Sequence, residues 1–459
     1  MKLTIIGGGG IRVPLIIYSV LSKLQEVAFG QIYLMDNDAE QLALITKICG
    51  LLIKKSGASI KLKGTTNAEE ALDGADYVIT TVREGKEQGR IIDERIALKH
   101  GLLGQETTGP GGFALALRNI PSIQQYAELM DRRCPKAWMF NFTNPAGLVT
   151  QSLRDAGFQK TIGVCDGANE AQHFTALYLN IPIERVKIEV FGLNHLSWAR
   201  RVWVNGENIL PELLDTDDFL ATSQMKVFTP ELVRNTGMWM NEYLYYYYHG
   251  EKAIKGILTD GKTRGEELLQ LNSELIEELT KTNPEETPNK SLSSYIKYNE
   301  RRSATYMHYA RPDAPSIVAA AGMKYSGGGI EKFSDGYASV ALNVIKALET
   351  GKQISVALIV PNANSINCLA PNDIVEVSCT VNAEGVHPDI IGDVPEEQEL
   401  LIRSVKRYER LTVNAIKHKS ISQAVFALMA HPLVLSYSLA ESLVHEIINS
   451  HPQLSSTWK

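Results

Sequence analysis

The chain has 459 residues, of which 46 are Lys or Arg and 52 are Asp or Glu, so its formal net charge is −6. This mild acidity argues against a nucleic-acid-binding surface, which needs clustered positive charge. Hydrophobic residues make up 44% and charged residues 21% of the chain, a globular composition that excludes a disordered, collagen-like or disulfide-scaffolded protein.

The first part of the chain alternates expected strands with expected helices. Short apolar runs predict strands at residues 2–6, 31–35, 76–81, 138–142 and 161–164. Helical patterns lie between them, notably at residues 11–23 and 38–55. Strands that alternate with helices build βαβ units with a parallel sheet, so we expect a Rossmann-like, doubly wound α/β domain over residues 1–195.

The pattern changes from residue 186 onward, and for residues 196–459 we expect a larger domain of mixed α+β structure. Strand-like runs lie at residues 186–192, 199–204, 356–360 and 374–381. Helical patterns cover residues 207–315, 327–348 and 397–448.

Four consecutive glycines directly follow the first expected strand: Gly7, Gly8, Gly9 and Gly10. Glycine lets the backbone approach a pyrophosphate, and the helix N-terminus that follows favours its negative charge. Asp36 ends the second expected strand, where a carboxylate accepts the ribose hydroxyls of NAD and repels a 2′-phosphate. Because Arg12 occupies the sixth position of the usual fingerprint, a glycine turn in an unrelated α/β fold is the alternative to an NAD site.

Two polar pairs stand directly after expected strands. Cys165 and Asp166 follow one strand, and Asn194 and His195 follow another. Open α/β sheets place their sites at the carboxyl ends of strands, and a thiolate with an imidazole is a good ligand pair for a divalent transition metal. Taken alone, a buried structural cysteine and histidine is the more common interpretation.

Two further stretches have the composition of a binding site. Asn144, in NFTNP, places a carboxamide between an expected strand and a helix start. Residues 83–112 combine Arg, Gln, Glu and Thr with a Gly-Pro-Gly-Gly turn, which is typical of a loop that faces an anion. A solvated helix followed by a loop explains the second stretch equally well.

Together these segments resemble glycoside hydrolase family 4, the NAD-dependent exception among glycosidases. The resemblance covers nearly the whole chain and rests on the order of IIGGGG, GRIIDERIALKHGLLGQETTGPGG, NFTNPAGLVT, GVCD, FGLNH, YLYYYY and TRGEE. Within the family the chain is most similar to 6-phospho-β-glucosidases. The resemblance implies a hydrolase of phosphorylated disaccharides or glycosides that needs NAD and Mn²⁺ or another divalent metal.

The resemblance also implies roles for individual residues. Cys165 and His195 match the two protein ligands of Mn²⁺, and Tyr243 matches the catalytic base. Asp166 matches the acid of the α-phosphoglucosidases, and Glu106 matches the residue that tunes the tyrosine. Without the resemblance, Tyr243 belongs to an ordinary apolar helix face.

Three more residues match substrate contacts in the family: Arg90, Asn144 and Arg264. We expect Arg264 at the sugar phosphate, whose oxygens fit a guanidinium fork. Two features depart from the family pattern, since Asp166 stands where the β-acting branch usually has Asn and Ala168 where the family usually has Pro. The scaffold therefore indicates β-linked substrates, whereas Asp166 indicates α-linked ones.

The chemistry implied by the resemblance is a redox-assisted elimination. NAD⁺ accepts a hydride from C3 of the sugar, and the resulting ketone acidifies the C2 proton. The metal acts as a Lewis acid on the C2 and C3 oxygens, a base removes the C2 proton, the C1–O bond breaks, water adds, and NADH returns the hydride. A phenol with an ordinary pKa of about 10 needs a nearby cation to act as that base.

Other functions share some of these features. An NAD-dependent 2-hydroxyacid dehydrogenase has the same N-terminal fold, and a non-catalytic NAD sensor needs only the glycine loop. A relative that acts on unphosphorylated sugars or uronates more often has His after the cysteine, where this chain has Asp166.

Location and assembly are also expected from the sequence. The start MKLTIIGGGG lacks the features of a signal peptide, and no run of about 18 apolar residues predicts a membrane span. The five cysteines are scattered, which favours a reducing cytoplasm over a disulfide framework or structural zinc. We expect a homodimer or homotetramer, as in relatives, with neither nucleic acid nor membrane as a partner.

Overall fold

The computed structural model describes residues 1–310, 324–326, 329–331 and 338–458. Its centre is a nine-stranded sheet in the order β15-β14-β13-β6-β5-β4-β1-β2-β3. These strands are β1 (Lys2–Ile6), β2 (Gln31–Met35), β3 (Lys61–Thr65), β4 (Tyr77–Thr80), β5 (Trp138–Asn141), β6 (Thr161–Gly163), β13 (Ile354–Pro361), β14 (Ile374–Asn382) and β15 (Gly385–Pro388). Strands β1 to β6 pair in parallel, whereas β13, β14 and β15 pair antiparallel.

Helices connect the parallel strands, as the alternating pattern predicts. They are α1 (Val13–Ser22), α2 (Ala39–Ser56), α3 (Ala68–Leu72), α4 (Lys86–Lys99), α5 (Gly109–Arg133), α6 (Ala146–Asp155) and α7 (Glu170–Leu179). Local signals set the ends of α2, because the Asp38 side chain accepts a hydrogen bond from the Gln41 N–H and Gly57 ends the helix at φ +72°. Strand β3 was not expected, since its residues KLKGT lie largely exposed at the sheet edge without apolar alternation.

A second sheet lies against the C-terminal strands of the first. It contains β7 (Val186–Leu193), β8 (Leu196–Val204), β9 (Glu207–Asn208) and β10 (Trp239–Met240). The Val190 N–H donates to Ser378 Oγ of β14 at 2.9 Å, and that hydroxyl donates to Ile188 O at 2.9 Å. These bonds fix the β7–β8 hairpin relative to the main sheet.

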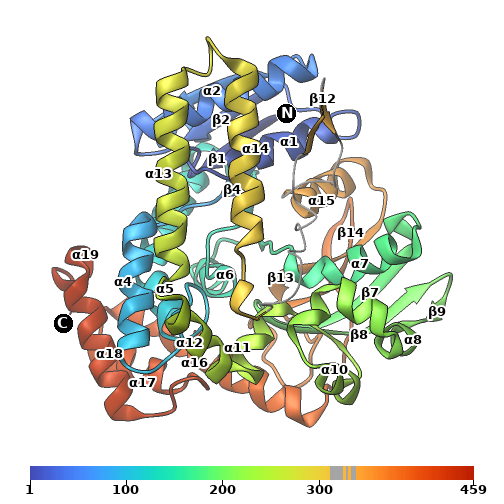
Figure 1. Cartoon of the computed structure of the whole chain (residues 1–459), viewed down its shortest axis with the longest axis vertical. Coiled ribbons are helices and arrows are strands. Elements are labelled where there is room, and N and C mark those ends of the chain that lie inside the picture. Colours follow the sequence, from blue (N-terminus) through green and yellow to red (C-terminus); the bar gives the residue numbers. More distant parts are fainter. Residues whose placement is uncertain (311–323, 327–328, 332–337, 459) are drawn as a thin grey trace.

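Two long antiparallel helices, α13 (Arg264–Thr282) and α14 (Pro288–Ala304), stand side by side along one side of the molecule (Figure 1). They reach the N-terminal half, where the buried Tyr295 hydroxyl donates to Ile11 O at 2.8 Å. The helix pair therefore supports the backbone just after the four glycines.

The remaining elements are the helices and strands of the C-terminal part and the short 3-10 turns of both parts. They are α8 (Leu210–Asp215), α9 (Asp217–Thr222), α10 (Pro230–Thr236), α11 (Tyr245–Tyr248), α12 (Gly250–Asp260), β11 (Lys324–Ser326), β12 (Gly329–Glu331), α15 (Ser339–Thr350), α16 (Glu396–His418), α17 (Ile421–Met429), α18 (Tyr437–Ser450) and α19 (Pro452–Ser455), with short 3-10 turns η1 (Gly167–Asn169), η2 (Ile183–Arg185), η3 (Gln224–Val227), η4 (Glu242–Leu244) and η5 (His308–Ala310).

The expected fold class is confirmed, with one difference in how its parts join. Strands β13 to β15 come from the C-terminal part but extend the N-terminal sheet, so the two parts share one sheet and the division after residue 195 stays a prediction. Of the helix expected over residues 327–348, α15 covers the part from Ser339 onward, whereas Gly329–Glu331 form strand β12 instead. Residues 327–328 and 332–337, and residues 311–315 of the helical region expected over 207–315, lie outside the described residues. Among the described residues, no helix is long and apolar enough to cross a membrane.

Candidate active site

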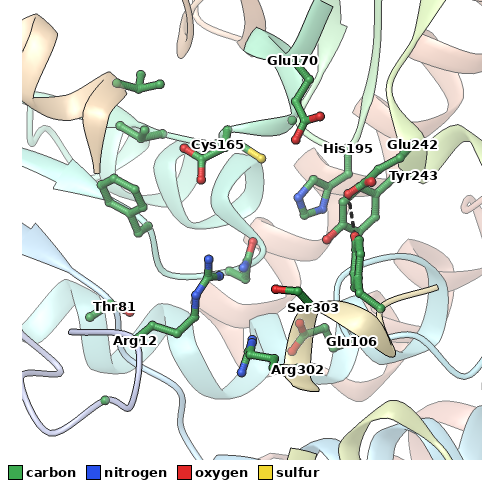
Figure 2. A pocket seen from close by; sticks show the side chains of 18 of the residues that line it. Arg12, Thr81, Glu106, Cys165, Glu170, His195, Glu242, Tyr243, Arg302 and Ser303 are labelled. Atoms are coloured by element: carbon green, nitrogen blue, oxygen red, sulfur yellow. Dashed lines mark hydrogen bonds between the residues drawn. The ribbon is translucent and has the colours of Figure 1, made fainter. Parts of the chain in front are cut away.

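One cavity of about 2510 Å³ lies at the carboxyl ends of β1, β4, β5 and β6 (Figure 2). It also receives the bend between β7 and β8, the η4 turn and the start of α13. The residues predicted from the sequence that line it are Gly7, Gly10, Asp36, Arg90, Glu106, Asn144, Cys165, Asp166, His195, Tyr243 and Arg264. The structure thus brings together predicted residues from segments far apart in the chain, whereas Gly8 and Gly9 do not line the cavity.

The glycine loop has no space for side chains. Gly7 has φ +88°, and a Cβ there would lie 2.6 Å from Thr81 O. A Cβ on Gly8 would lie 2.7 Å from the Met35 nitrogen. The Gly9 N–H donates to Asp36 Oδ2 at 2.9 Å, which fixes the carboxylate at the end of β2. This close-packed turn fits a dinucleotide, because Gly7, Gly10 and the Asp36 carboxylate line one cavity edge just before α1 begins.

The thiol and imidazole predicted to hold a metal face the same space. Cys165 follows β6, and His195 lies in the β7–β8 bend at φ +62°. Figure 2 shows the Cys165 sulfur directed toward the His195 ring. Burial lowers the pKa of His195 to about 4, so the imidazole is neutral and able to bind a metal.

The environment of the Cys165 thiol also fits a metal ligand. Burial and the charges of Glu376 and Asp166 raise the pKa of its thiol well above the ordinary range. A divalent cation would replace that proton and relieve the buried charge. The described residues contain no cluster of three or more His, Cys, Asp or Glu side chains arranged to hold a metal, so the pair fits a metal that keeps positions open for substrate.

Tyr243 stacks directly on the imidazole. The ring centroids of Tyr243 and His195 are 3.7 Å apart, and the ring planes differ by 4°. Burial and the neighbouring Glu242 raise the pKa of Tyr243, and a hydrogen bond with Tyr306 acts against them. Tyr306 in turn donates to Glu242 Oε1 at 2.6 Å. In this environment the phenol keeps its proton, so a cation must be added before it becomes a base.

Glu106 lies on the opposite side of the cavity from Cys165 (Figure 2). It is ion-paired with Arg83 and with Arg90, whose Nη1 is 3.0 Å from Glu106 Oε2. Burial alone would raise the pKa of Glu106, but the positive charges of Arg83 and Arg90 hold it well below its ordinary range. The carboxylate therefore stays ionised and adds to the negative charge felt by Tyr243.

Arginine side chains gather beside Glu106. Arg264 donates to Thr305 Oγ1 at 2.6 Å and to the Arg302 carbonyl at 2.7 Å. Burial and the charge of Arg302 lower the pKa of Arg264, whereas its ion pair with Glu267 acts to raise it. Arg302 was not predicted, because no motif marks its position at the end of α14.

Two predicted residues have less specific surroundings. Burial raises the pKa of Asp166 to about 7, although Arg12 acts to lower it, so this carboxyl holds a proton near neutrality. Asn144 lines the cavity, and its carbonyl accepts a hydrogen bond from Asn119 Nδ2 at 2.6 Å. Glu242 and Tyr306 also line the cavity, but no local sequence signal predicts them.

Comparison with known proteins identifies the family. The model for family 4 glycosyl hydrolases matches residues 2–181, and the model for the C-terminal domain of that family matches residues 190–434. This chain belongs to glycosyl hydrolase family 4. The family resemblance of the sequence is therefore confirmed.

Individual relatives of this family 4 glycosyl hydrolase align over nearly its whole length. The 6-phospho-beta-glucosidase of Escherichia coli K12 is 30% identical, over 98% of this chain and 95% of its own. The maltose-6′-phosphate glucosidase of Bacillus subtilis is 26% identical over 98% and 95%. A structure of the Thermotoga maritima 6-phospho-beta-glucosidase with manganese, NAD⁺ and glucose-6-phosphate superposes with a TM-score of 0.81, 28% identity and 99% coverage of both chains.

Proposed function

We propose that this family 4 glycosyl hydrolase cleaves 6-phosphorylated glycosides, with 6-phospho-β-glucosides as substrates and NAD⁺ and Mn²⁺ as cofactors. One observation carries the proposal: a glycine loop, a thiol–imidazole pair, a phenol and an arginine cluster line the same cavity. When bound, NAD⁺ supplies a reversible hydride acceptor and the metal supplies a Lewis acid. The names of the E. coli and T. maritima relatives support the β-linked substrate.

The residues of the chain have separable tasks in this function. Asp36 accepts the ribose hydroxyls of the dinucleotide, while the tight turn at Gly7 lets the pyrophosphate approach the backbone. Cys165 and His195 hold the metal next to Tyr243, whose oxygen takes the proton from C2 of the sugar. Because its surroundings raise the pKa of Tyr243, the phenol acts as a base near neutrality only when the metal charge is added.

The arginine cluster selects phosphorylated sugars. Arg264 and Arg302 are half-buried, and the positive charge of Arg302 is only partly offset at Arg264 by Glu267, so a phosphate dianion between the two guanidinium groups gains paired contacts with both. Arg90 is held by Glu94 at 2.7 Å and by Glu106 at 3.0 Å. It therefore orients Glu106 and presents its remaining N–H groups to substrate.

A second candidate is the hydrolysis of 6-phospho-α-glucosides, and Asp166 favours it. A carboxyl with its pKa raised to about 7 by burial can protonate the oxygen of a leaving group. The relative from B. subtilis named maltose-6′-phosphate glucosidase also supports it.

The deciding experiment compares 4-nitrophenyl glucosides that differ in anomer and in the 6-phosphate, each with Mn²⁺, NAD⁺ and reductant. The proposal expects turnover of the phosphorylated β-anomer, little turnover of the unphosphorylated compounds, and no accumulation of NADH. Faster turnover of the phosphorylated α-anomer selects the second candidate. Stoichiometric NADH identifies a dehydrogenase and contradicts both candidates.

We also propose that the enzyme works in the cytoplasm as a homodimer or homotetramer, with phosphorylated glycosides as its small-molecule partners. Phe426, Leu435 and Tyr437 are 50%, 71% and 49% exposed, which supports burial between copies of the chain. All five cysteines are free, as a reducing compartment requires. Light scattering after size-exclusion chromatography measures the mass of the assembly.

A further inference from the structure

Glu376 is a buried carboxylate to which the proposed chemistry assigns no task. It lies on β14 and is 1% exposed. Its Oε1 accepts a hydrogen bond from Asn194 Nδ2 at 3.2 Å, and its Oε2 accepts one from Ser197 Oγ at 2.7 Å. Asn194 belongs to the bend between β7 and β8 that contains His195, and Ser197 is the second residue of β8. One side chain from a distant strand therefore holds this bend on both sides of the predicted metal ligand.

The hydrogen bonds from Glu376 form two branches, one through Asn194 and one through Ser197. The Asn194 branch connects Glu376 with the Cys165 thiol. Asn194 Oδ1 accepts from the Gly147 N–H at 3.4 Å, so its amide nitrogen faces Glu376. The same side chain hydrogen-bonds Cys165 and acts to lower the thiol pKa, against the larger raising effect of burial. Because an amide nitrogen has two protons, Glu376 takes one and leaves the other for the sulfur.

The Ser197 branch leads to the phenol. Ser197 Oγ accepts from Asn241 Nδ2 at 3.3 Å, and the Ser197 carbonyl accepts from the Asn241 N–H at 3.0 Å. Asn241 Oδ1 then accepts from the Tyr243 N–H at 3.0 Å, at the start of the η4 turn. Two side chains thus connect Glu376 to the backbone that carries the predicted base.

We propose that Glu376 is a positioning residue that aligns the metal-binding thiol, the imidazole bend and the base of this active site. The inference rests on the proposed function, because Cys165 and Tyr243 have those roles only there. His195 has φ +62°, which a residue with a side chain adopts rarely and only when its surroundings enforce it. The Glu376 side chain fits this centre because both of its oxygens accept and both of its partners donate, and these two hydrogen bonds act against burial, which raises the pKa of Glu376 to about 7.

The test replaces Glu376 with Gln, which preserves the volume but turns one acceptor into a donor. Loss of such an outer partner typically costs about 10- to 100-fold in metal affinity. We therefore expect Glu376→Gln to bind Mn²⁺ that much more weakly in an electron paramagnetic resonance titration of free Mn²⁺. The thiolate-to-metal absorption of the Co²⁺-loaded protein should weaken in parallel, while the affinity for NAD⁺ should stay as in the wild type.

Asp373→Asn is the matched control. Asp373 is 2% exposed and directly precedes β14, but it pairs with Arg410 and not with the bend. The control should keep the wild-type Mn²⁺ affinity. Equal affinity in Glu376→Gln and the wild type overturns the inference, and so does equal weakening in both variants. A wild-type chain that binds no Mn²⁺ contradicts the proposed function itself.

The two branches provide an independent measurement should Glu376→Gln fail to fold. Asn194→Ala cuts the branch to the thiol, so it should weaken Mn²⁺ binding. Ser197→Ala cuts the branch to the phenol, so it should lower kcat at saturating Mn²⁺ more than it weakens Mn²⁺ binding. A reversed pattern, or the same loss of both quantities in both variants, overturns the inference.

Discussion

Two edges of the cavity are held in different ways. The edge predicted to bind the nucleotide, at Gly7 to Gly10, is held mainly by backbone contacts. The edge predicted to be catalytic, at His195 and Tyr243, is held by side chains from distant segments. At the nucleotide edge, the N–H groups of Gly7 and Gly8 both donate to Met35 O, at 2.9 and 2.7 Å. At the catalytic edge, Glu376 of β14 orients residues on both sides of His195. We therefore expect backbone-changing substitutions to damage the first edge and isosteric side-chain substitutions to damage the second.

The largest expected effect is at the base. Tyr243→Phe keeps the ring stacked on His195 but removes the hydroxyl, so kcat should fall by about 10²–10⁴, the usual contribution of a general base. NAD⁺ binding should not change. Turnover of a phosphorylated glycoside in D₂O measures the same step, because proton removal at C2 should place deuterium there in the product.

Tyr245→Phe is the control for that experiment, since Tyr245 is 4% exposed and packs against Phe228 and His249 instead of His195. It should retain nearly full kcat. A fully active Tyr243→Phe variant, or a product that keeps its C2 hydrogen in D₂O, would show that Tyr243 is not the base.

The next effect concerns the nucleotide edge. Gly7→Ala introduces a Cβ 2.6 Å from Thr81 O at φ +88°. The backbone conformation costs about 1–2 kcal/mol, and the overpacking costs about 1–3 kcal/mol more. Both the free energy of unfolding and the affinity for NAD⁺ should fall, as measured by urea unfolding and by isothermal titration calorimetry.

Gly57→Ala separates the two costs at Gly7, because Gly57 has φ +72° with no atom within 4 Å of an added Cβ. It should show the conformational cost alone and leave NAD⁺ binding intact. If both variants lose the same stability and neither loses NAD⁺ affinity, close packing of the glycine loop does not control nucleotide binding.

Substitution in the arginine cluster, which contains Arg264 and Arg302, should have a smaller effect, and this effect should appear in the KM for phosphorylated substrates. Arg302→Gln removes a charge-assisted contact worth about 1.5–3 kcal/mol, which corresponds to roughly 10- to 100-fold in KM for a 6-phosphorylated glycoside. Arg403→Gln, in which the lost side chain is 62% exposed, is the control and should leave KM unchanged. A kcat loss without a change in KM would argue against a phosphate contact.

The last effect appears only on acidification and concerns the pH dependence of stability. Burial lowers the pKa of His431 from 6.5 to about 3, and its Nδ1 accepts from the Leu433 N–H at 3.1 Å. Between these pKa values the unfolded state binds a proton that the folded state does not. The free energy of unfolding therefore rises with pH over this window, by up to about 1.4 kcal/mol per pH unit, and is lost on acidification.

His431→Asn keeps an acceptor for the Leu433 N–H but cannot bind that proton. In urea unfolding between pH 4 and pH 6.5, the free energy of unfolding of this variant should rise less steeply with pH than that of the wild type. The difference in slope corresponds to at most one bound proton. Identical slopes would show that His431 is not the group responsible.

Some strands and site residues could be predicted from the sequence, and others could not. The strands from β1 to β8 other than β3, the glycine loop and the Cys165 and His195 positions follow from local patterns and from the order of motifs. Strand β3 has no such pattern, because an exposed edge strand needs no buried face. Arg302 and Glu376 have no motif either, since each is recognised only by what surrounds it.

The sequence by itself determined the family, the parallel core of the sheet and the chemical groups predicted to react. Those features depend on short runs of neighbouring residues, such as a strand followed by glycines or by a cysteine. Only the tertiary structure decided that β13 to β15 join the N-terminal sheet and that Glu376 lies behind the bend at His195. Burial and hydrogen-bond partners decide what a carboxylate or guanidinium does, and these partners come from parts of the chain that no local pattern connects.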